Sequence, residues 1–239
     1  MIHNNDFDVP KIVIVGHVDH GKSSFIGRLL YDIGEIQKEK FGELKKASKK
    51  RGEEFEFAFL LDALQDERDQ GITIDTTRIF FKTKKRKYVF IDAPGHKEFI
   101  RNMITGAASA DIAILIVDVK DGIKQQTKKH SYLLKLLGIE KVITLYNKMD
   151  KISYSESKFL NIKAELDEFL SNIGIESYTS LPISSKKGDN IVSLSKNMRW
   201  YHGQSFVEIL DGYKIQENNK SEFIRFPVQD IYKLGDKRV

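Results

Sequence analysis

The stretch Gly16-His17-Val18-Asp19-His20-Gly21-Lys22-Ser23 follows directly on the apolar run 12–15. Its spacing fits G-x-x-x-x-G-K-[ST], in which glycines let backbone N–H groups converge on phosphate oxygens while the lysine and the hydroxyl meet the terminal phosphates and Mg2+. Residues 24–30 continue with helical periodicity, so the positive end of a helix would face the anion. The sequence therefore predicts a strand, a phosphate-binding loop and a helix, in preference to a simple glycine turn.

Length and composition describe a folded protein without disulfides. The 239 residues, 41% of them apolar, suffice for one large domain or two small ones. With no cysteine, the chain has neither a disulfide nor a thiolate zinc site. No apolar run approaches about 18 residues and the first eight residues are polar, so we expect no membrane association and a cytoplasmic location.

The formal net charge of +5 comes largely from two basic clusters, at 38–51 and 82–87. The second cluster lies between two runs that resemble strands, 77–81 and 88–91, which is typical of a solvated hairpin turn. A nucleic-acid patch is the alternative, but no aromatic residue is interleaved with the basic ones as a stacking platform would require. Nucleic acid is therefore not the expected partner.

Apolar runs alternate with helical periodicity along the chain, which predicts an α/β fold. The expected sheet is six-stranded and mostly parallel, with one antiparallel strand from the hairpin and helices on both faces. Strands are expected at 12–15, 79–81, 88–91, 112–117, 141–146 and 180–183, and helices at 22–31, 97–107, 125–137, 155–170 and 204–210. The long connection 34–75 has helical patterning of its own, and a connection of that length is usually functional.

A second motif, Asp92-Ala93-Pro94-Gly95-His96, stands where the run 88–91 ends. Ligands bind at the carboxyl edge of open α/β sheets, so Asp92 is a candidate to hold Mg2+ through water. Gly95 can offer its N–H to a γ-phosphate, and His96 is the candidate for orienting an attacking water. The alternatives are an ordinary turn and a structural histidine, and the position one hairpin after the phosphate loop favours the functional interpretation.

A third motif, Asn147-Lys148-Met149-Asp150, ends the run 142–146 and suits guanine. A carboxylate can accept from the N1–H and the exocyclic amino group of guanine, whereas adenine has no donor at either place. The alternative is an Asx turn that closes a strand. A fourth motif, Ser184-Ser185-Lys186, follows the last expected strand and can present backbone N–H groups to the guanine O6.

These four motifs, in this order, resemble the G domain of the translation-factor class of P-loop GTPases over residues 9–211. The resemblance implies GTP or GDP and Mg2+ as ligands, and it matches 69–75 to switch I. It also implies that Ser23 and Thr73 ligate Mg2+, with Asp92 holding it through water. His96 and Gly95 would set the hydrolytic water in line, while Lys22 neutralises the β- and γ-phosphates. A monovalent cation is implied near Asp19.

The complete predicted GTP site takes residues from the first, third and fourth motifs. Its members are Gly16, His17, Val18, Asp19, His20, Gly21, Lys22, Ser23, Ser24, Asn147, Lys148, Asp150, Ser184, Ser185 and Lys186. The catalytic candidates are Lys22, Thr73, Gly95 and His96. Proteins of the translation-factor class normally continue into β-barrel domains. We therefore expect a G domain over 9–216, then a linker and the first strand of a truncated barrel over 217–239.

Within this class, the stretches 59–68, 126–131 and 198–203 resemble the GTPase subunit of bacterial sulfate adenylyltransferase. That resemblance implies GTP hydrolysis coupled to formation of adenosine 5'-phosphosulfate from ATP and sulfate, with a catalytic small subunit as partner in a heterodimer. His20 and Ser185 depart from the pattern of that subunit, and His20 resembles elongation factors. The alternatives are a translation factor that controls tRNA or ribosome binding, and a nucleotide-binding fragment that acts as an interaction module.

Overall fold

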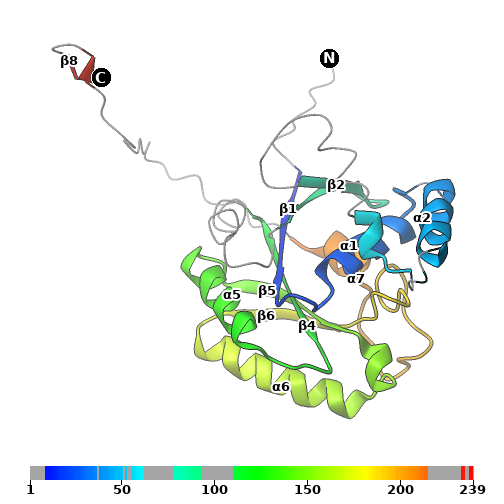
Figure 1. The fold of residues 1–239 in the computed structure, drawn as a ribbon. Helices are drawn as coiled ribbons and strands as arrows, with labels where there is room; N and C mark the ends of the chain where they lie inside the picture. The colour runs from blue at the N-terminus through cyan, green and yellow to red at the C-terminus, as the bar shows by residue number, and fades with distance from the viewer. Residues whose placement is uncertain are drawn as a thin grey trace.

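In the computed structural model, the described residues are 9–36, 38–50, 52, 55–61, 78–92, 110–214, 233–234 and 237–238. They contain a six-stranded sheet in the order β2-β3-β1-β4-β5-β6 (Figure 1). Strand β2 runs antiparallel to β3, and every other pair is parallel. The strands are β1 (Lys11–Gly16), β2 (Arg78–Lys82), β3 (Lys87–Asp92), β4 (Ile112–Asp118), β5 (Lys141–Asn147) and β6 (Glu176–Pro182). The predicted mixed sheet is confirmed.

Helices cover both faces of this sheet, as predicted (Figure 1). They are α1 (Lys22–Asp32), α2 (Lys38–Lys50), α5 (Gln125–Leu136), α6 (Glu156–Asn172) and α7 (Phe206–Gly212). Because side chains alternate along a strand, Ile12 and Ile14 of β1 enter the core under α1 and α7. Val13 and Val15 enter the second core, under α5 and α6. The central strand is therefore apolar on both faces and fixes the loop that follows it.

Several predicted boundaries differ from the observed ones, and the differences at β6 and α7 have a clear physical reason. Strand β6 covers Glu176–Pro182 and not 180–183, because its first half is polar and half-exposed at the edge of the sheet. Helix α7 begins at Phe206, because Ser205 and Glu208 form a capping box that ends the preceding loop. Helix α2 lies within the long connection 34–75, where helical patterning was expected. The helix expected at 97–107 and the expected linker at 217–222 lie outside the described residues.

The basic cluster 82–87 forms the hairpin turn between β2 and β3, as predicted. Thr83 donates its hydroxyl to Asp211 Oδ1 at 2.7 Å, and the carbonyl of Arg86 lies 3.2 Å from the same hydroxyl oxygen. Tyr88 donates to the same carboxylate oxygen at 2.9 Å, so the hairpin is fastened to α7. Strands β7 (Lys233–Leu234) and β8 (Lys237–Arg238) pair with each other. Among the described helices, none has the length and apolar character that a membrane span requires.

Candidate functional site

The loop between β1 and α1 needs glycine at position 21. Gly21 has φ of 90° and caps α1 without a side-chain hydrogen bond. A Cβ atom at this position would lie 2.5 Å from Asn147 Nδ2, so any other residue would be both strained and in collision. No capping side chain therefore covers the backbone at the start of α1. Its N–H groups are available to an anion at the positive end of the helix dipole.

Lys22 lies against the loop that precedes it. Its Nζ donates to the carbonyl of Gly16 at 2.9 Å and to that of His17 at 3.0 Å. These contacts hold the ammonium beside the backbone that is predicted to cradle phosphates. The role predicted for Lys22, neutralisation of phosphate charge, stays a prediction.

A cavity of about 690 Å³ opens beside this loop, and its size is typical of a small-molecule site. Residues of the first, third and fourth motifs line it, and so do residues 55–58, which belong to none of the predicted motifs. The lining residues are Val18, Asp19, Gly21, Lys22, Ser23, Ser24, Phe55, Glu56, Phe57, Ala58, Asn147, Lys148, Asp150, Lys151, Ser185 and Lys186. The fold thus brings together three motifs that lie up to 168 residues apart, from Val18 to Lys186.

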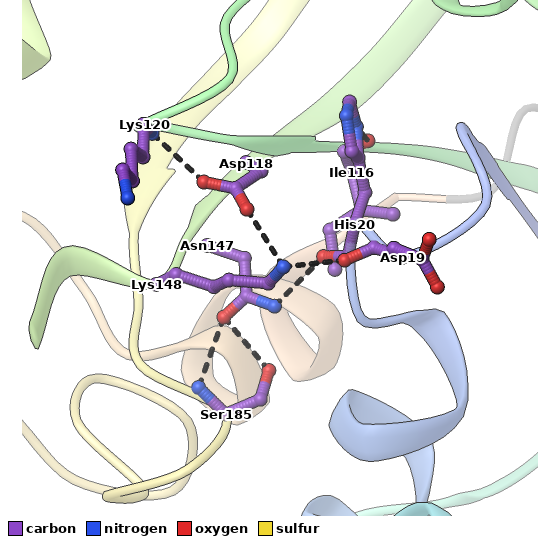
Figure 2. A network of polar contacts seen from close by, with 8 residues as sticks. All are labelled: Asp19, His20, Ile116, Asp118, Lys120, Asn147, Lys148 and Ser185. Atoms are coloured by element: carbon purple, nitrogen blue, oxygen red, sulfur yellow. Dashed lines mark hydrogen bonds and ion pairs between the residues drawn. The ribbon is translucent and has the colours of Figure 1, made fainter. Parts of the chain in front are cut away.

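Asn147 joins the phosphate loop to the fourth motif (Figure 2). Its Nδ2 donates to the carbonyl of His20 at 2.9 Å. Its Oδ1 accepts from the backbone N–H of Ser185 at 3.0 Å and from the Ser185 hydroxyl at 2.9 Å. Since the side chain is 1% exposed, these bonds are sheltered from water and fix the spacing of the two loops.

Lys148 makes a second link between the same regions. Its Nζ donates to the carbonyl of Asp19 and forms an ion pair with Asp118 Oδ2 at 2.7 Å. Lys148 has φ of 66°, a left-handed conformation that is costly for a lysine and is typical of a functional site. Figure 2 shows the ammonium between Asp118 and the Asp19 backbone, with the Asp19 carboxylate turned away from this network. A cation near that carboxylate stays a prediction.

Asp118 is a site residue that the sequence reasoning missed. It is 2% exposed, and its Oδ1 accepts from the backbone N–H of Lys120 at 2.8 Å. Burial alone would raise the pKa of Asp118, but the hydrogen bonds from Lys148 and Lys120 outweigh it and lower the pKa. The signal was present, because Asp118 ends an apolar strand at the same sheet edge as Asp92.

Asp150 is oriented by the fourth motif. Ser184 donates its hydroxyl to Asp150 Oδ1 at 2.6 Å and accepts from the N–H of Lys187 at 3.2 Å. Ser184 thus fixes one of the two carboxylate oxygens of Asp150, and the role of Asp150 in reading the base stays a prediction. The backbone N–H groups of Ser184 and Ser185 already donate to Asp189 and Asn147, so their predicted role at the guanine O6 requires those bonds to be exchanged.

The two histidines of the phosphate loop do not line the cavity. His20 is fully buried, with Nδ1 3.3 Å from the carbonyl of Ile116, and burial lowers its pKa to about 4. His17 Nδ1 lies 2.7 Å from Gln126 Oε1. Any contact of His20 with a nucleotide is therefore through its backbone, because the ring belongs to the core behind the loop.

The segment 55–58 forms a wall of the cavity that the sequence did not predict. Arg28 of α1 holds it, with its guanidinium carbon 4.7 Å from the centre of the Phe57 ring. The same side chain donates to the carbonyl of Lys186 at 3.0 Å and pairs with Asp32 at 2.8 Å. Arg28 thus connects the fourth motif to the aromatic segment, whose alternating Phe55, Phe57 and Phe59 were the available signal.

Several predicted site residues lie outside the described residues. These are Thr73, Gly95 and His96. The backbone of Asp92 ends β3 beside Ile14 of β1, at the sheet edge where the sequence placed it. Of the three predicted Mg2+ ligands, the structure describes the position of the Ser23 side chain, which lines the cavity.

The sequence comparisons identify relatives of this chain. The model for "Elongation factor Tu GTP binding domain" matches residues 8–213. The chain is 43% identical over 223 residues to elongation factor 1-alpha of Pyrococcus furiosus, covering 93% of this chain and 52% of that protein. It is 40% identical over 228 residues to elongation factor 1-alpha of Thermoplasma acidophilum, covering 93% and 54%. The chain thus spans about half the length of these curated relatives.

Solved structures of similar proteins lead to the same class of protein as the sequence comparisons. Sup35 complexed with GMPPNP matches with a TM-score of 0.62 at 26% identity, covering 87% of this chain and 45% of that one. A bacterial selenocysteine-specific elongation factor, EF-Sec, matches with a TM-score of 0.55 at 27% identity, covering 86% and 29%. These relatives do not support the narrower resemblance to a sulfate adenylyltransferase subunit, and they favour the translation-factor alternative. The chain belongs to the family of elongation factor Tu GTP-binding domains, with the fold of a P-loop GTPase.

Proposed function

We propose that this chain is the nucleotide-binding domain of a translation elongation- or release-factor-type GTPase, whose GTP state controls tRNA or ribosome binding in the cytoplasm. One observation carries the proposal. Asn147 and Lys148 tie the phosphate loop to the motif that is suited to guanine, around one cavity. The relatives named elongation factor 1-alpha support the translation class.

For the proposed hydrolysis, the residues act by position and charge, which is what phosphoryl transfer chiefly requires. Lys22 and the N–H groups at the start of α1 would bind the β- and γ-phosphates. Ser23 fits an Mg2+ ligand, because its hydroxyl follows Lys22 in the lining of the cavity. Thr73, Asp92, Gly95 and His96 are proposed to complete the metal site and to place the water. Mg2+ would supply charge neutralisation between the phosphate oxygens.

For the proposed base recognition, Asp150 is the residue that distinguishes guanine from adenine. Ser184 fixes one carboxylate oxygen at 2.6 Å, which leaves the other to accept from the base. An adenine ring has no donor to offer there, so the half-buried carboxylate, covered by the bound base, would lose a hydrogen bond. The alkyl stem of Lys148 would lie beside the base, because its ammonium is anchored at Asp19 and Asp118.

A GTPase subunit of sulfate adenylyltransferase is the second candidate. Three stretches of sequence, 59–68, 126–131 and 198–203, support it, and its proposed partner is the catalytic small subunit. The two candidates share the nucleotide site and differ in what stimulates it. Ribosomes are the expected activator for a translation factor, whereas ATP, sulfate and the small subunit together are the expected activators for the sulfurylase complex.

The test begins with displacement of a fluorescent GDP analogue by GTP and by ATP. We expect GTP to compete at least about a hundredfold better, since a missing hydrogen bond to a buried polar group is strongly penalised. GTP turnover is then measured in the full-length protein with ribosomes, and separately with the small subunit, ATP and sulfate. Stimulation by ribosomes alone supports the proposal, and stimulation that needs the small subunit, ATP and sulfate overturns it in favour of the second candidate.

A further inference from the structure

The edge strand β2 presents a basic and aromatic stripe on its exposed face. Arg78, Phe80 and Lys82 are exposed, while Ile79 and Phe81 between them are buried in the core. Alternate residues of a strand lie about 7 Å apart on the same face, so a ring is flanked by one cation on either side. Phe80 is 59% exposed, an unusual environment for a phenylalanine. We call these three residues the β2 stripe.

The hairpin that carries this stripe is strongly basic. Residues 78–91 contain six lysines and arginines and no aspartate or glutamate. Lys87 of β3 lies opposite Lys82, and Lys84 and Lys85 are exposed at the turn. Two carboxylates lie close to these six cations: Asp211 accepts from the hydroxyls of Thr83 and Tyr88, and Glu35 accepts from the backbone N–H of Lys82 at 3.0 Å. The hairpin therefore carries a local excess of positive charge.

Protection of a sheet edge accounts for only part of this pattern. Lysines on an edge strand prevent pairing with other chains, so the cations alone need no partner. An exposed phenylalanine on the same strand has the opposite effect, because its apolar surface favours association with other molecules. Tyr132, an exposed ring elsewhere, packs on Phe169 at 5.8 Å between centres, whereas Phe80 meets no other ring of the described segments.

A small hollow adjoins the ring. It has a volume of about 250 Å³, an apolar floor from Val9 and from Val89 and Ile91 of β3, and the cations Lys11 and Arg78 in its lining. Its lining residues are Val9, Lys11, Arg78, Phe80, Val89 and Ile91. A flat apolar group that stacks on Phe80 would cover this floor, while an anionic chain attached to it would meet the flanking cations.

We propose that the β2 stripe and the turn at Lys84 and Lys85 bind single-stranded RNA, with a base stacked on Phe80 and phosphates on the cations. Stacking rings combined with a basic track are the features by which proteins hold unpaired strands. The choice of RNA rests on the proposed translation-type function. The sequence argued against this because it offered no aromatic residue within 82–87, whereas strand pleating places Phe80 among the basic side chains.

The test is fluorescence anisotropy of a labelled single-stranded RNA of about 12 nucleotides, within the range of known binding-site sizes. The full-length protein is compared with F80A and with the double variant K84A/K85A. Two variants serve as matched controls: Y132A removes an exposed ring, and K45A/K46A removes two exposed lysines of α2. Binding of a fluorescent GDP analogue is measured for each, as a check of the fold and of the nucleotide site.

We expect F80A to weaken RNA binding by about 5- to 150-fold, since stacking of one base is worth about 1–3 kcal/mol. We expect K84A/K85A to reduce the slope of log K against log salt by about 1.4, because about 0.7 counterions are released per contact with a single strand. The controls should keep wild-type affinity. Equal losses in test and control variants, or binding of a DNA strand of the same sequence instead of RNA, would overturn the proposal.

Absence of RNA binding in the wild-type protein would also overturn the RNA-binding proposal. The exposed ring of Phe80 would then be expected to contact a protein partner or another part of the full-length chain. The nucleotide readout separates this outcome from failure of the proposed function. If GDP binds and RNA does not, only the β2 stripe is wrongly assigned. If RNA binds and GDP does not, the GTPase assignment fails while the contact surface stands.

Discussion

The carboxylate of Asp118 lies 2.7 Å from the ammonium of Lys148, across the carboxyl ends of the neighbouring strands β4 and β5. The same ammonium reaches the carbonyl of Asp19, so one side chain connects two strand ends and the phosphate loop. Because Asp118 is buried, the pair is shielded from water and from salt. Asp118 is therefore a positioning residue, which acts on a nucleotide through Lys148.

We expect D118N to accelerate dissociation of GDP by about 10- to 150-fold, since a hydrogen bond to a charged group is worth about 1.5–3 kcal/mol. The measurement is the dissociation rate of a fluorescent GDP analogue by stopped flow. D121N is the matched control, because Asp121 lies in the same loop and is exposed. If D118N lowers thermal stability but leaves the dissociation rate at the wild-type value, the residue is structural and does not position Lys148.

Asp150 gives a prediction about base specificity. D150N replaces an acceptor by a group that can also donate, so it should weaken GTP far more than xanthosine triphosphate, whose base offers an acceptor where guanine has an amino group. Competition of both nucleotides against a fluorescent GDP analogue measures the ratio of affinities. Equal losses for the two nucleotides would remove Asp150 from the base-recognition role. The same change at exposed Asp121 is expected to leave the ratio unchanged.

The central fold was predictable because its signals are local. The buried strands β1, β4 and β5 are continuous apolar runs, and a glycine loop or a polar motif follows each of them at the sheet edge. Strand β6 was placed four residues late because it is an edge strand whose first half alternates polar residues without a strong apolar face. Local pattern therefore identifies central strands better than edge strands.

The site was predictable where a motif carries the chemistry in one contiguous stretch, and not where a contact joins distant segments. Asp118 gains its role from Lys148, thirty positions later, and Phe57 gains its role from Arg28. The burial of His20 also follows from tertiary packing, since its neighbours in sequence are polar or glycine. None of these pairings has a signature in spacing, because they depend on which strands become neighbours in the sheet.

A comparison of substitutions at Gly21 and Gly138 distinguishes the cost of backbone strain from the cost of a steric clash. Both have positive φ, 90° and 79°, but a Cβ at Gly21 would lie 2.5 Å from Asn147 Nδ2, whereas nothing lies within 4 Å at Gly138. G138A should therefore cost about 1–2 kcal/mol of folding free energy and leave GDP affinity unchanged. G21A should lose the same amount and, in addition, displace Asn147 and weaken GDP by at least about tenfold. The measurements are urea denaturation and equilibrium GDP binding, and equal GDP affinities in the two variants would contradict the argument.

Buried His130 predicts how stability depends on pH. It is 8% exposed, and burial together with the charge of Lys22 lowers its pKa to about 4, from 6.5. The folded state therefore binds the proton less well than the unfolded state, and stability is complete above pH 6.5 and is lost as the pH falls toward 4. By pH 5 the loss from this group should be about 2 kcal/mol.

The variant H130L removes the titrating group and fills its site with an apolar side chain. Its free energy of unfolding, measured in urea, should therefore fall less between pH 7 and pH 5 than that of the wild type, by about 2 kcal/mol. H202L is the control, because it makes the same change at an exposed histidine. His20 is buried in the same way and keeps its own contribution in both variants, so some acid sensitivity should persist. If H130L and the wild type lose the same stability, the ring is protonated in the folded protein and the argument from burial fails.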